Sequence, residues 1–316
     1  APSPTRREAR NGCPQELTMF VFMPPGAMPV ALMLQHGPMI RTWLRLFVKS
    51  MLAAYLPKRP HAEYRPVIET IDPPARYLVE AYQDWCGVAR PDALTVPPHL
   101  FCQWGLSPAL RMFDQSPYNL AEVINQGVSM RVYAPLPAGR RLIVRASLES
   151  IIESGGVTQV AVRITTGTAE QPERVVAILH SAFLKPGASQ RAAMTKPFKA
   201  TTKAWAFSGH WQAEPGDGRQ FALLTGDFNP IHWLDSAGRK SPFGRTVLQG
   251  LGMFARTYEQ LARQGHIREI EVRFQRPVPL PSGVLAVETA PAAEKGWNVV
   301  RLVDADQRAC LTGRYR

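Results

Sequence analysis

The stretch TGDFNPIHWLDSAGRKSPFGRTVLQGLG, which runs from Thr225 to Gly252, decides how this chain is interpreted. It places Asp227, Asn229 and His232 within six consecutive residues. A carboxylate and an imidazole this close in sequence can share one water molecule and move protons to and from it. The stretch therefore predicts an acid–base site directly before a segment with helical spacing.

The Asn229-Pro230 step explains how the two titratable side chains reach one cavity. Side chains five positions apart, such as Asp227 and His232, do not share one face of a regular helix. The residue before a proline is pushed out of the α region, so a turn is favoured here. We expect Asn229 to hold this turn through hydrogen bonds from its side chain to the backbone, with direct substrate contact as the alternative.

Gly250 begins a second informative segment. After it, Leu251, Phe254, Tyr258 and Leu261 recur at three- and four-residue spacing, which predicts a helix with one apolar face. The backbone N–H of Gly250 would lie at the helix start, where the dipole favours negative charge. Glycine also lets a substrate approach the backbone closely. This amide is therefore a candidate donor to a developing oxyanion.

The chain contains a weak internal repeat. Residues 128–146 and 270–288 each read as an alternating apolar strand, a PLPxG turn and a second strand. Pro135 in the first copy corresponds to Pro279 in the second, and each copy is preceded by a helix candidate. A shared offset for several elements favours duplicated units, although the second copy carries two extra residues.

Each half is expected to consist of a helix followed by half-buried antiparallel strands, because most strand candidates alternate with period two. One helix wrapped by a curved antiparallel sheet explains both patterns. We therefore predict an α+β double hot-dog, with two antiparallel sheets each wrapped around a central helix and able to join edge to edge. The expected strands are 128–133, 142–151, 157–166 and 175–184 in the first half, and 269–275, 284–289, 297–303 and 309–315 in the second.

The halves are not equivalent. We expect residues 1–15 to be a disordered terminus, 16–184 a degenerate hot-dog domain, 185–203 a polar linker and 204–316 the catalytic hot-dog domain. The first half has no counterpart of the Asp227/His232 motif, and its His99 and Cys102 are expected to be packing residues. The vacant half could then supply a tunnel for an acyl chain.

The pattern GDxNPxH at residues 226–232 resembles the signature of the MaoC-like (R)-specific enoyl-thioester hydratases and dehydratases, which have a hot-dog fold. The resemblance implies that Asp227 and His232 activate the water that adds to a trans-2-enoyl thioester, giving a (3R)-3-hydroxyacyl thioester. The reverse reaction is a dehydration. Asn229 and the Gly250 amide complete the implied catalytic set, without any cofactor.

The chain departs from the family pattern in two places. Gln249 stands where the family usually has a histidine before the glycine. The loop after the histidine reads HWLDS and then PFGRT, and it contains Arg239, Lys240 and Arg245. We expect these three cations to contact the phosphates or carrier of the substrate; a solvated loop is the alternative.

Two other functional classes fit the same motif. A non-catalytic scaffold would keep the fold and bind acyl thioesters without turnover, which the Gln249 substitution and the diverged first half favour. A hot-dog thioesterase would release free thiol, whereas a hydratase leaves the thioester intact.

Composition limits the partners. The net charge is +12, but no nucleic-acid-binding motif accompanies it, so coenzyme A or an acidic acyl carrier protein is the expected anionic partner. The four cysteines fit neither a zinc site nor a disulfide framework, which favours a reduced, cytoplasmic protein without metal. A double hot-dog can stand alone, so a monomer or homodimer is expected.

Residues 39–56 form the most apolar stretch, yet Arg41, Arg45 and Lys49 interrupt it. A spanning helix needs about 20 largely uncharged residues, so we expect no membrane span. The three cations recur every four residues and form one stripe, with Leu44 and Val48 largely on the other side. Such a basic amphipathic helix could lie on a membrane surface, or pack on the core with a solvated basic edge.

Overall fold

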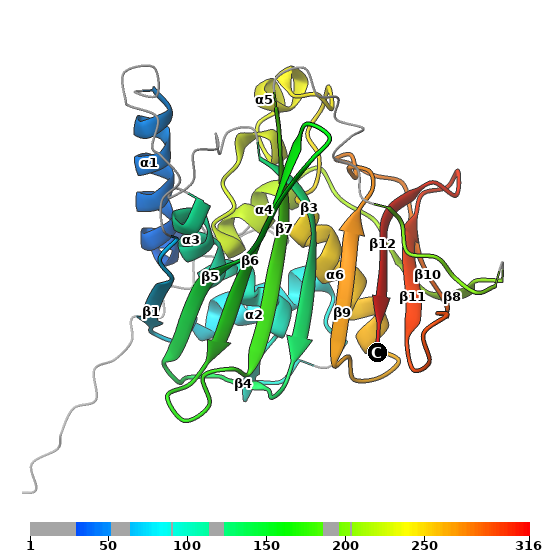
Figure 1. Cartoon of the computed structure of the whole chain (residues 1–316), viewed down its shortest axis with the longest axis horizontal. Helices are drawn as coiled ribbons and strands as arrows, with labels where there is room; N and C mark the ends of the chain where they lie inside the picture. The colour runs from blue at the N-terminus through cyan, green and yellow to red at the C-terminus, as the bar shows by residue number, and fades with distance from the viewer. Residues whose placement is uncertain (1–29, 52–63, 90, 114–122, 186–195, 203) are drawn as a thin grey trace, which may run out of the picture.

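The computed structural model describes residues 30–51, 64–89, 91–113, 123–185, 196–202 and 204–316. A ten-stranded antiparallel sheet dominates it, with the order β1-β5-β6-β7-β3-β9-β12-β11-β10-β8 (Figure 1). The two halves meet where β3 (Ile124–Val132) pairs with β9 (Glu269–Phe274). The two expected sheets thus join at this edge into one continuous sheet, in which pairing satisfies the backbone groups that two free edges would expose.

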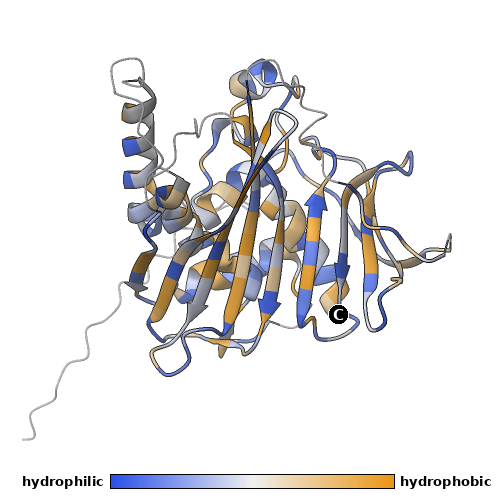
Figure 2. Ribbon diagram, in the orientation of Figure 1, coloured by the Kyte–Doolittle hydropathy of each residue, from blue (hydrophilic) through white to orange (hydrophobic). Residues whose placement is uncertain are grey.

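The strands follow the alternation predicted from the sequence, and each expected strand has a counterpart. Figure 2 shows polar and apolar bands alternating along β9. The short strands β1 and β8 at the two outer edges were not expected. The remaining strands are β1 (Val67–Ile71), β2 (Thr95–Val96), β4 (Leu136–Pro137), β5 (Leu142–Ser154), β6 (Val157–Gly167), β7 (Val175–Leu184), β8 (Ala206–Trp211), β10 (Leu285–Pro291), β11 (Asn298–Val303) and β12 (Ala309–Tyr315).

The helices lie mostly behind the sheet in the view of Figure 1. The central helix of the first half packs against β1, β5 and β6, and that of the second half packs against β3 and β8. The second of these helices begins at Gly250, as predicted from the sequence. The helices are η1 (Val30–His36), α1 (Gly37–Met51), α2 (Arg76–Cys86), η2 (Pro98–Leu100), α3 (Phe101–Phe113), α4 (Asp217–Thr225), η5 (Pro230–His232), α5 (Asp235–Lys240) and α6 (Gly250–Ala262).

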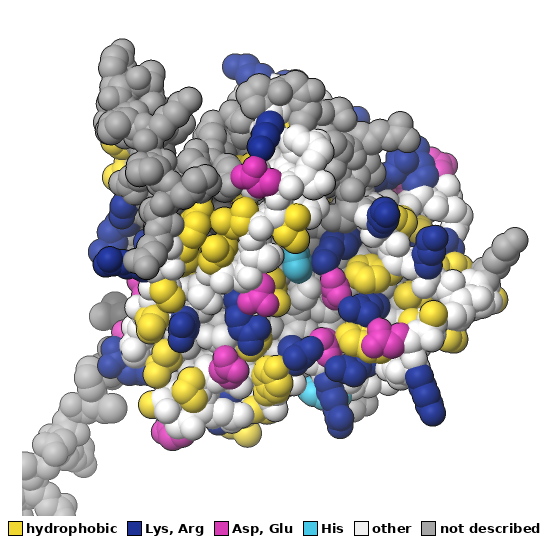
Figure 3. Space-filling view, viewed as in Figure 1, with side chains coloured by type: hydrophobic (Ala, Val, Ile, Leu, Met, Phe, Trp, Pro, Cys, Tyr) yellow, Lys and Arg dark blue, Asp and Glu magenta, His cyan; other side chains and the backbone are white. Residues whose placement is uncertain are grey.

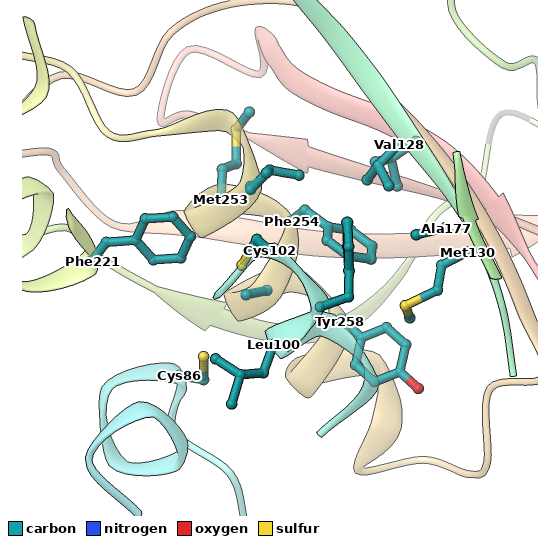
Figure 4. Packing of buried hydrophobic residues seen from close by; sticks show 14 of the residues in the cluster. Cys86, Leu100, Cys102, Val128, Met130, Ala177, Phe221, Met253, Phe254 and Tyr258 are labelled. Carbon is teal, nitrogen blue, oxygen red and sulfur yellow. The ribbon is translucent and has the colours of Figure 1, made fainter. Parts of the chain in front are cut away.

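The core is shared by both halves. Figure 4 shows Phe254 and Tyr258 of α6 lying toward Val128 and Met130 of β3, and all four are buried. His99 is also buried, and its Nε2 lies 2.6 Å from a carboxylate oxygen of Glu259 on α6. His99 thus connects the first half to the helix that starts at the candidate site.

A second buried polar contact fixes the helices relative to one another. The Arg256 guanidinium of α6 makes two hydrogen bonds to the Asp217 carboxylate of α4, at 2.6 and 2.8 Å. It also lies over the Trp85 ring of α2, 4.1 Å from the ring centroid. Trp85 donates its indole N–H to the same carboxylate. The side chains of Trp85, Asp217 and Arg256, which we call the charged node, therefore connect α2, α4 and α6.

The helix α1 is attached to the body by only part of its surface. Met39 is buried, and the Thr42 hydroxyl lies 3.0 Å from the Ser107 hydroxyl of α3. Leu44 and Val48, which we expected on the packed side, are exposed beside the exposed Arg41. The reason is that α1 stands at the margin of the molecule, where it packs against α3 (Figure 1).

Three of the segments with expectations from the sequence lie wholly or largely outside the described residues. These are residues 1–15, residues 52–56 and the expected linker. In the described part of the chain, no helix is long and apolar enough to cross a bilayer.

The charged node generates a prediction about stability. Replacing Arg256 with Met leaves the buried Asp217 carboxylate without its cation, and we expect the free energy of unfolding in urea to fall by about 3–5 kcal/mol. Adding Asp217→Asn to this variant should restore part of the loss. Arg263→Met, which alters an exposed arginine directly after the same helix, is the matched control and should change stability by less than about 0.5 kcal/mol. Equal stability of Arg256→Met and the control would contradict the role of the node.

Contact of α1 with a membrane stays a prediction. We expect the protein to cosediment with anionic phosphatidylglycerol vesicles, and Leu44→Glu to reduce the bound fraction because Leu44 is 63% exposed on this helix. Leu94→Glu is the control, because Leu94 is 78% exposed on a distant loop. Equal sedimentation of the two variants would argue against α1 as the contact.

Candidate functional site

The candidate site begins where α4 ends. Gly226 takes a left-handed conformation, with φ of 81°, and closes the helix by donating its N–H to Ala222. A side chain there would also crowd His36, whose Nδ1 lies 3.1 Å from the Cβ position. His36 comes from η1 and donates its Nε2–H to the Leu223 carbonyl at 2.7 Å. The Asp227 turn is therefore supported by a residue far away in sequence.

The next residues form the turn predicted from the Asn229-Pro230 step. The Asn229 side chain accepts a hydrogen bond from the Ile231 N–H at 3.4 Å and caps the short helix η5. This is the structural role expected for Asn229. The turn ends at His232, which lies partly exposed together with Asp227.

A single hydrogen bond determines which ring nitrogen of His232 carries the proton. Its Nδ1 lies 2.7 Å from the Val247 carbonyl oxygen, which can only accept a hydrogen bond. Nδ1 therefore carries a proton, and in the neutral ring Nε2 is left as an acceptor. Gly218 of α4 lies against the His232 backbone, where any side chain would overlap the His232 carbonyl.

The environment of Asp227 suits a general base. Removal of its carboxyl from water raises the pKa of Asp227, while a positive charge on His232 and the Asn229 backbone N–H act in the opposite direction. The Asp227 charge also contributes to the raised pKa of the Cys102 thiol, although burial is the larger cause. Because Cys102 lies on α3, the site is close to the central helix of the first half.

Gln249 replaces the expected histidine but is well connected. Its side-chain amide donates to the Gly218 carbonyl at 2.9 Å and to the Asp227 carbonyl at 3.4 Å. Two carbonyl acceptors identify this end of the amide as nitrogen. Its Oε1 is buried and has no hydrogen-bond partner within the described residues. Gln249 thus connects the start of α6 with the Asp227 turn, a role that the sequence did not reveal.

The position of Gly250 requires glycine. It is the first residue of α6, so its N–H has no acceptor within the helix. A Cβ at this position would come within 2.5 Å of the Phe274 ring on β9. The Gly250 amide thus begins a helix directly after Gln249, whose side chain bonds to the Asp227 carbonyl.

The three loop cations lie in the segment of the chain that follows His232. Arg239 and Lys240 end α5, and Arg245 follows a few residues later; all three are exposed. The structure places them near the sequence-predicted pair without showing what they bind. Among the described residues, no group of His, Cys, Asp and Glu side chains is arranged to hold a metal ion.

Two cavities of about 400 Å³ lie elsewhere on the surface. One is lined by Arg276, Ser282 and Cys310, and the other by Pro73, Gln83 and Thr95. Neither is lined by Asp227 or His232, so the candidate site rests on its polar geometry and not on the size of a cavity.

Comparison with known families decides what the second half is. Residues 185–303 match the family described as the MaoC like domain. The second half of the chain contains a MaoC-like domain. The match begins within the region expected to be a linker and includes every residue of the candidate site. No curated protein sequence matches the chain significantly.

Solved structures agree on the fold. HtdX of Mycobacterium tuberculosis aligns with a TM-score of 0.65 and 18% identity, covering 80% of this chain and 99% of its own. A MaoC-like dehydratase from Phytophthora capsici aligns with a TM-score of 0.67 and 14% identity, covering 82% and 97%. A conserved hypothetical protein of M. tuberculosis described as a double hot-dog aligns with a TM-score of 0.51 and 15% identity, covering 80% and 95%. The hot-dog prediction is confirmed at the level of the fold.

The raised pKa of Asp227 generates a prediction about stability and pH. A carboxyl that binds its proton more tightly when folded destabilises the folded state once it is ionised. Asp227→Asn should therefore raise the melting temperature at pH 7. The gain should shrink as the pH falls through the folded-state pKa and vanish below the unfolded-state value of about 3.9.

The control for this experiment is Asp84→Asn, which alters an exposed carboxylate on α2. We expect it to leave the melting temperature nearly unchanged between pH 3 and pH 8. A lower melting temperature for Asp227→Asn at pH 7 would show that the carboxylate stabilises the fold, contrary to the proposed desolvation.

Proposed function

We propose that the protein catalyses the reversible hydration of trans-2-enoyl thioesters to (3R)-3-hydroxyacyl thioesters, in fatty-acid metabolism. The proposal is supported by the electrostatic contact between Asp227 and His232, and by the Gln249 side chain, which bonds to the Asp227 carbonyl directly before the Gly250 amide at the start of α6. The MaoC-like domain supports a hydratase or dehydratase activity in general. We propose the (R)-specific form of the reaction because residues 226–232 resemble the GDxNPxH signature of the (R)-specific enzymes.

Asp227 is the proposed base. As the water oxygen attacks the β-carbon, Asp227 takes one proton from that water, and the electron pair of the double bond moves toward the thioester. Its raised pKa makes Asp227 a stronger base than an ordinary carboxylate, and lets the resulting acid return the proton to the α-carbon. Water is thereby added without any net change in the protonation of the site.

His232 and Gly250 have complementary proposed roles. The Val247 carbonyl holds the Nδ1 proton of His232, so Nε2 can accept a hydrogen bond from the second hydrogen of the water. Negative charge that develops on the thioester oxygen would be stabilised by the Gly250 N–H at the start of α6. Asn229 supports the turn between the two side chains, and Gln249 connects this turn to α6.

We predict that the protein removes the enoyl absorbance of crotonyl-, octenoyl- or dodecenoyl-coenzyme A without releasing thiol, and gives the (3R) product in chiral analysis. Asp227→Asn and His232→Ala should each lower kcat by about 100-fold or more, because positioned acid–base groups contribute about 10²–10⁴-fold. Asp84→Asn and His210→Ala alter exposed residues of the same types and should leave kcat unchanged.

The alternatives predict different results in the same assay. Release of free thiol would identify a thioesterase. Binding of the thioester without turnover, in a folded protein and also with carrier-protein substrates, would identify an acyl-thioester-binding scaffold.

A further inference from the structure

The chain between His232 and Val247 forms a distinct lobe at the site, which we call the α5 lobe (residues 233–246). Its two ends are held together by the 2.7 Å hydrogen bond from His232 to the Val247 carbonyl. Inside the lobe, Gly238 packs so closely on Thr246 that a Cβ would come within 2.5 Å of its backbone nitrogen. The Ser241 hydroxyl donates to the Gly238 carbonyl at 2.6 Å. The α5 lobe is therefore folded on itself and projects beside the site (Figure 1).

Two aromatic side chains of the α5 lobe are exposed. Trp233 is 41% exposed and Phe243 is 43% exposed, although large aromatic side chains usually bury most of their surface. The Trp233 indole N–H donates to the Phe228 carbonyl at 3.2 Å, which fixes the ring next to the Asp227 turn. The exposed Trp233 ring, held next to the Asp227 turn, is suited to stacking, and Phe243 is a second exposed ring on the same lobe.

The cations of the α5 lobe differ from those of the sheet. On the sheet, Arg301 and Arg314 form ion pairs with glutamates, and Figure 3 shows the two charge types interspersed on that face. Arg239, Lys240 and Arg245 have no carboxylate partner within the described residues. The acidic residue of the lobe, Asp235, instead lies 3.5 Å from the Thr246 hydroxyl. The lobe therefore carries three exposed cations and one carboxylate, together with two exposed aromatic rings.

We propose that the α5 lobe binds the nucleotide end of coenzyme A, which is an ADP group with an added 3′-phosphate. This inference rests on the proposed function, because it assigns the carrier of the thioester. Arg and Lys side chains bind phosphate oxygens with charge-assisted hydrogen bonds, and aromatic faces stack on nucleobases. Three cations match the three phosphate groups of the carrier, and Trp233 or Phe243 supplies a surface for the adenine.

The size of the α5 lobe favours a nucleotide over an acyl carrier protein. A stable protein–protein interface buries about 800 Å² on each partner. A compact lobe with one six-residue helix offers less continuous surface, but enough for a base and its phosphates. The lobe also adjoins His232, so a ligand bound to it could extend its thioester arm to the site.

The decisive experiment compares two substrates that differ only in the carrier: crotonyl-coenzyme A, and the crotonyl thioester of N-acetylcysteamine, which lacks the nucleotide. The test variant is Arg239→Ala/Lys240→Ala/Arg245→Ala, with Phe243→Ala measured separately. We expect the triple variant to lose about tenfold or more in kcat/KM for the coenzyme A substrate, and to stay within about twofold of the wild type for the truncated one. Lys295→Ala and Phe207→Ala, which alter exposed residues of the second half far from the lobe in sequence, are the matched controls.

A binding measurement separates this inference from the proposed function. Adenosine 3′,5′-bisphosphate is titrated calorimetrically into the full chain. It should bind the wild type, and its affinity for the triple variant should be about tenfold or more weaker. Absence of this binding, or equal losses of kcat/KM for both thioesters, would overturn the inference. A larger loss with a carrier-protein thioester would assign the lobe to that protein instead. If the protein binds the bisphosphate but turns over neither thioester, the nucleotide-binding role of the α5 lobe stands and the proposed hydratase function is contradicted.

Discussion

The pairing of β3 with β9 is the constraint on which the rest of the structure depends. It joins the two halves into one sheet, with Val128 opposite Val272 and Met130 opposite Ile270. Gly127 allows the strands to approach, because a side chain there would overlap the Val272 carbonyl. Once the sheets are continuous, α3 and α6 lie on one face of the same surface, and Asp227 comes close to Cys102 of the other half.

Buried polar contacts then fix the helices behind the sheet. The Arg256–Asp217–Trp85 node connects three helices, and the His99–Glu259 pair connects η2 with α6. These groups are shielded from water, so each depends on its partner far more than a surface ion pair would. Since α4 leads into the Asp227 turn and α6 begins at Gly250, the same contacts set the distance between the base and the free amide.

The sequence predicted the local features well, because they depend on neighbouring residues. The alternation of apolar side chains located the strands, and the Asn229-Pro230 step located the turn. Features that depend on distant partners were missed. The exposure of Leu44 depends on where α1 stands, and the role of Gln249 depends on two carbonyl groups on other elements. No local pattern carries that information.

The contact of His36 with the Asp227 turn has a consequence for how such a chain can evolve. His36 belongs to the first half, yet it bonds to Leu223 and lies edge-on to Phe228, with ring centroids 5.8 Å apart. The half without the motif is therefore not a spare copy that can drift or be deleted freely. The two halves are therefore not independent modules: the segment around His36 supports the Asp227 turn, so a substitution there can alter the site in the second half.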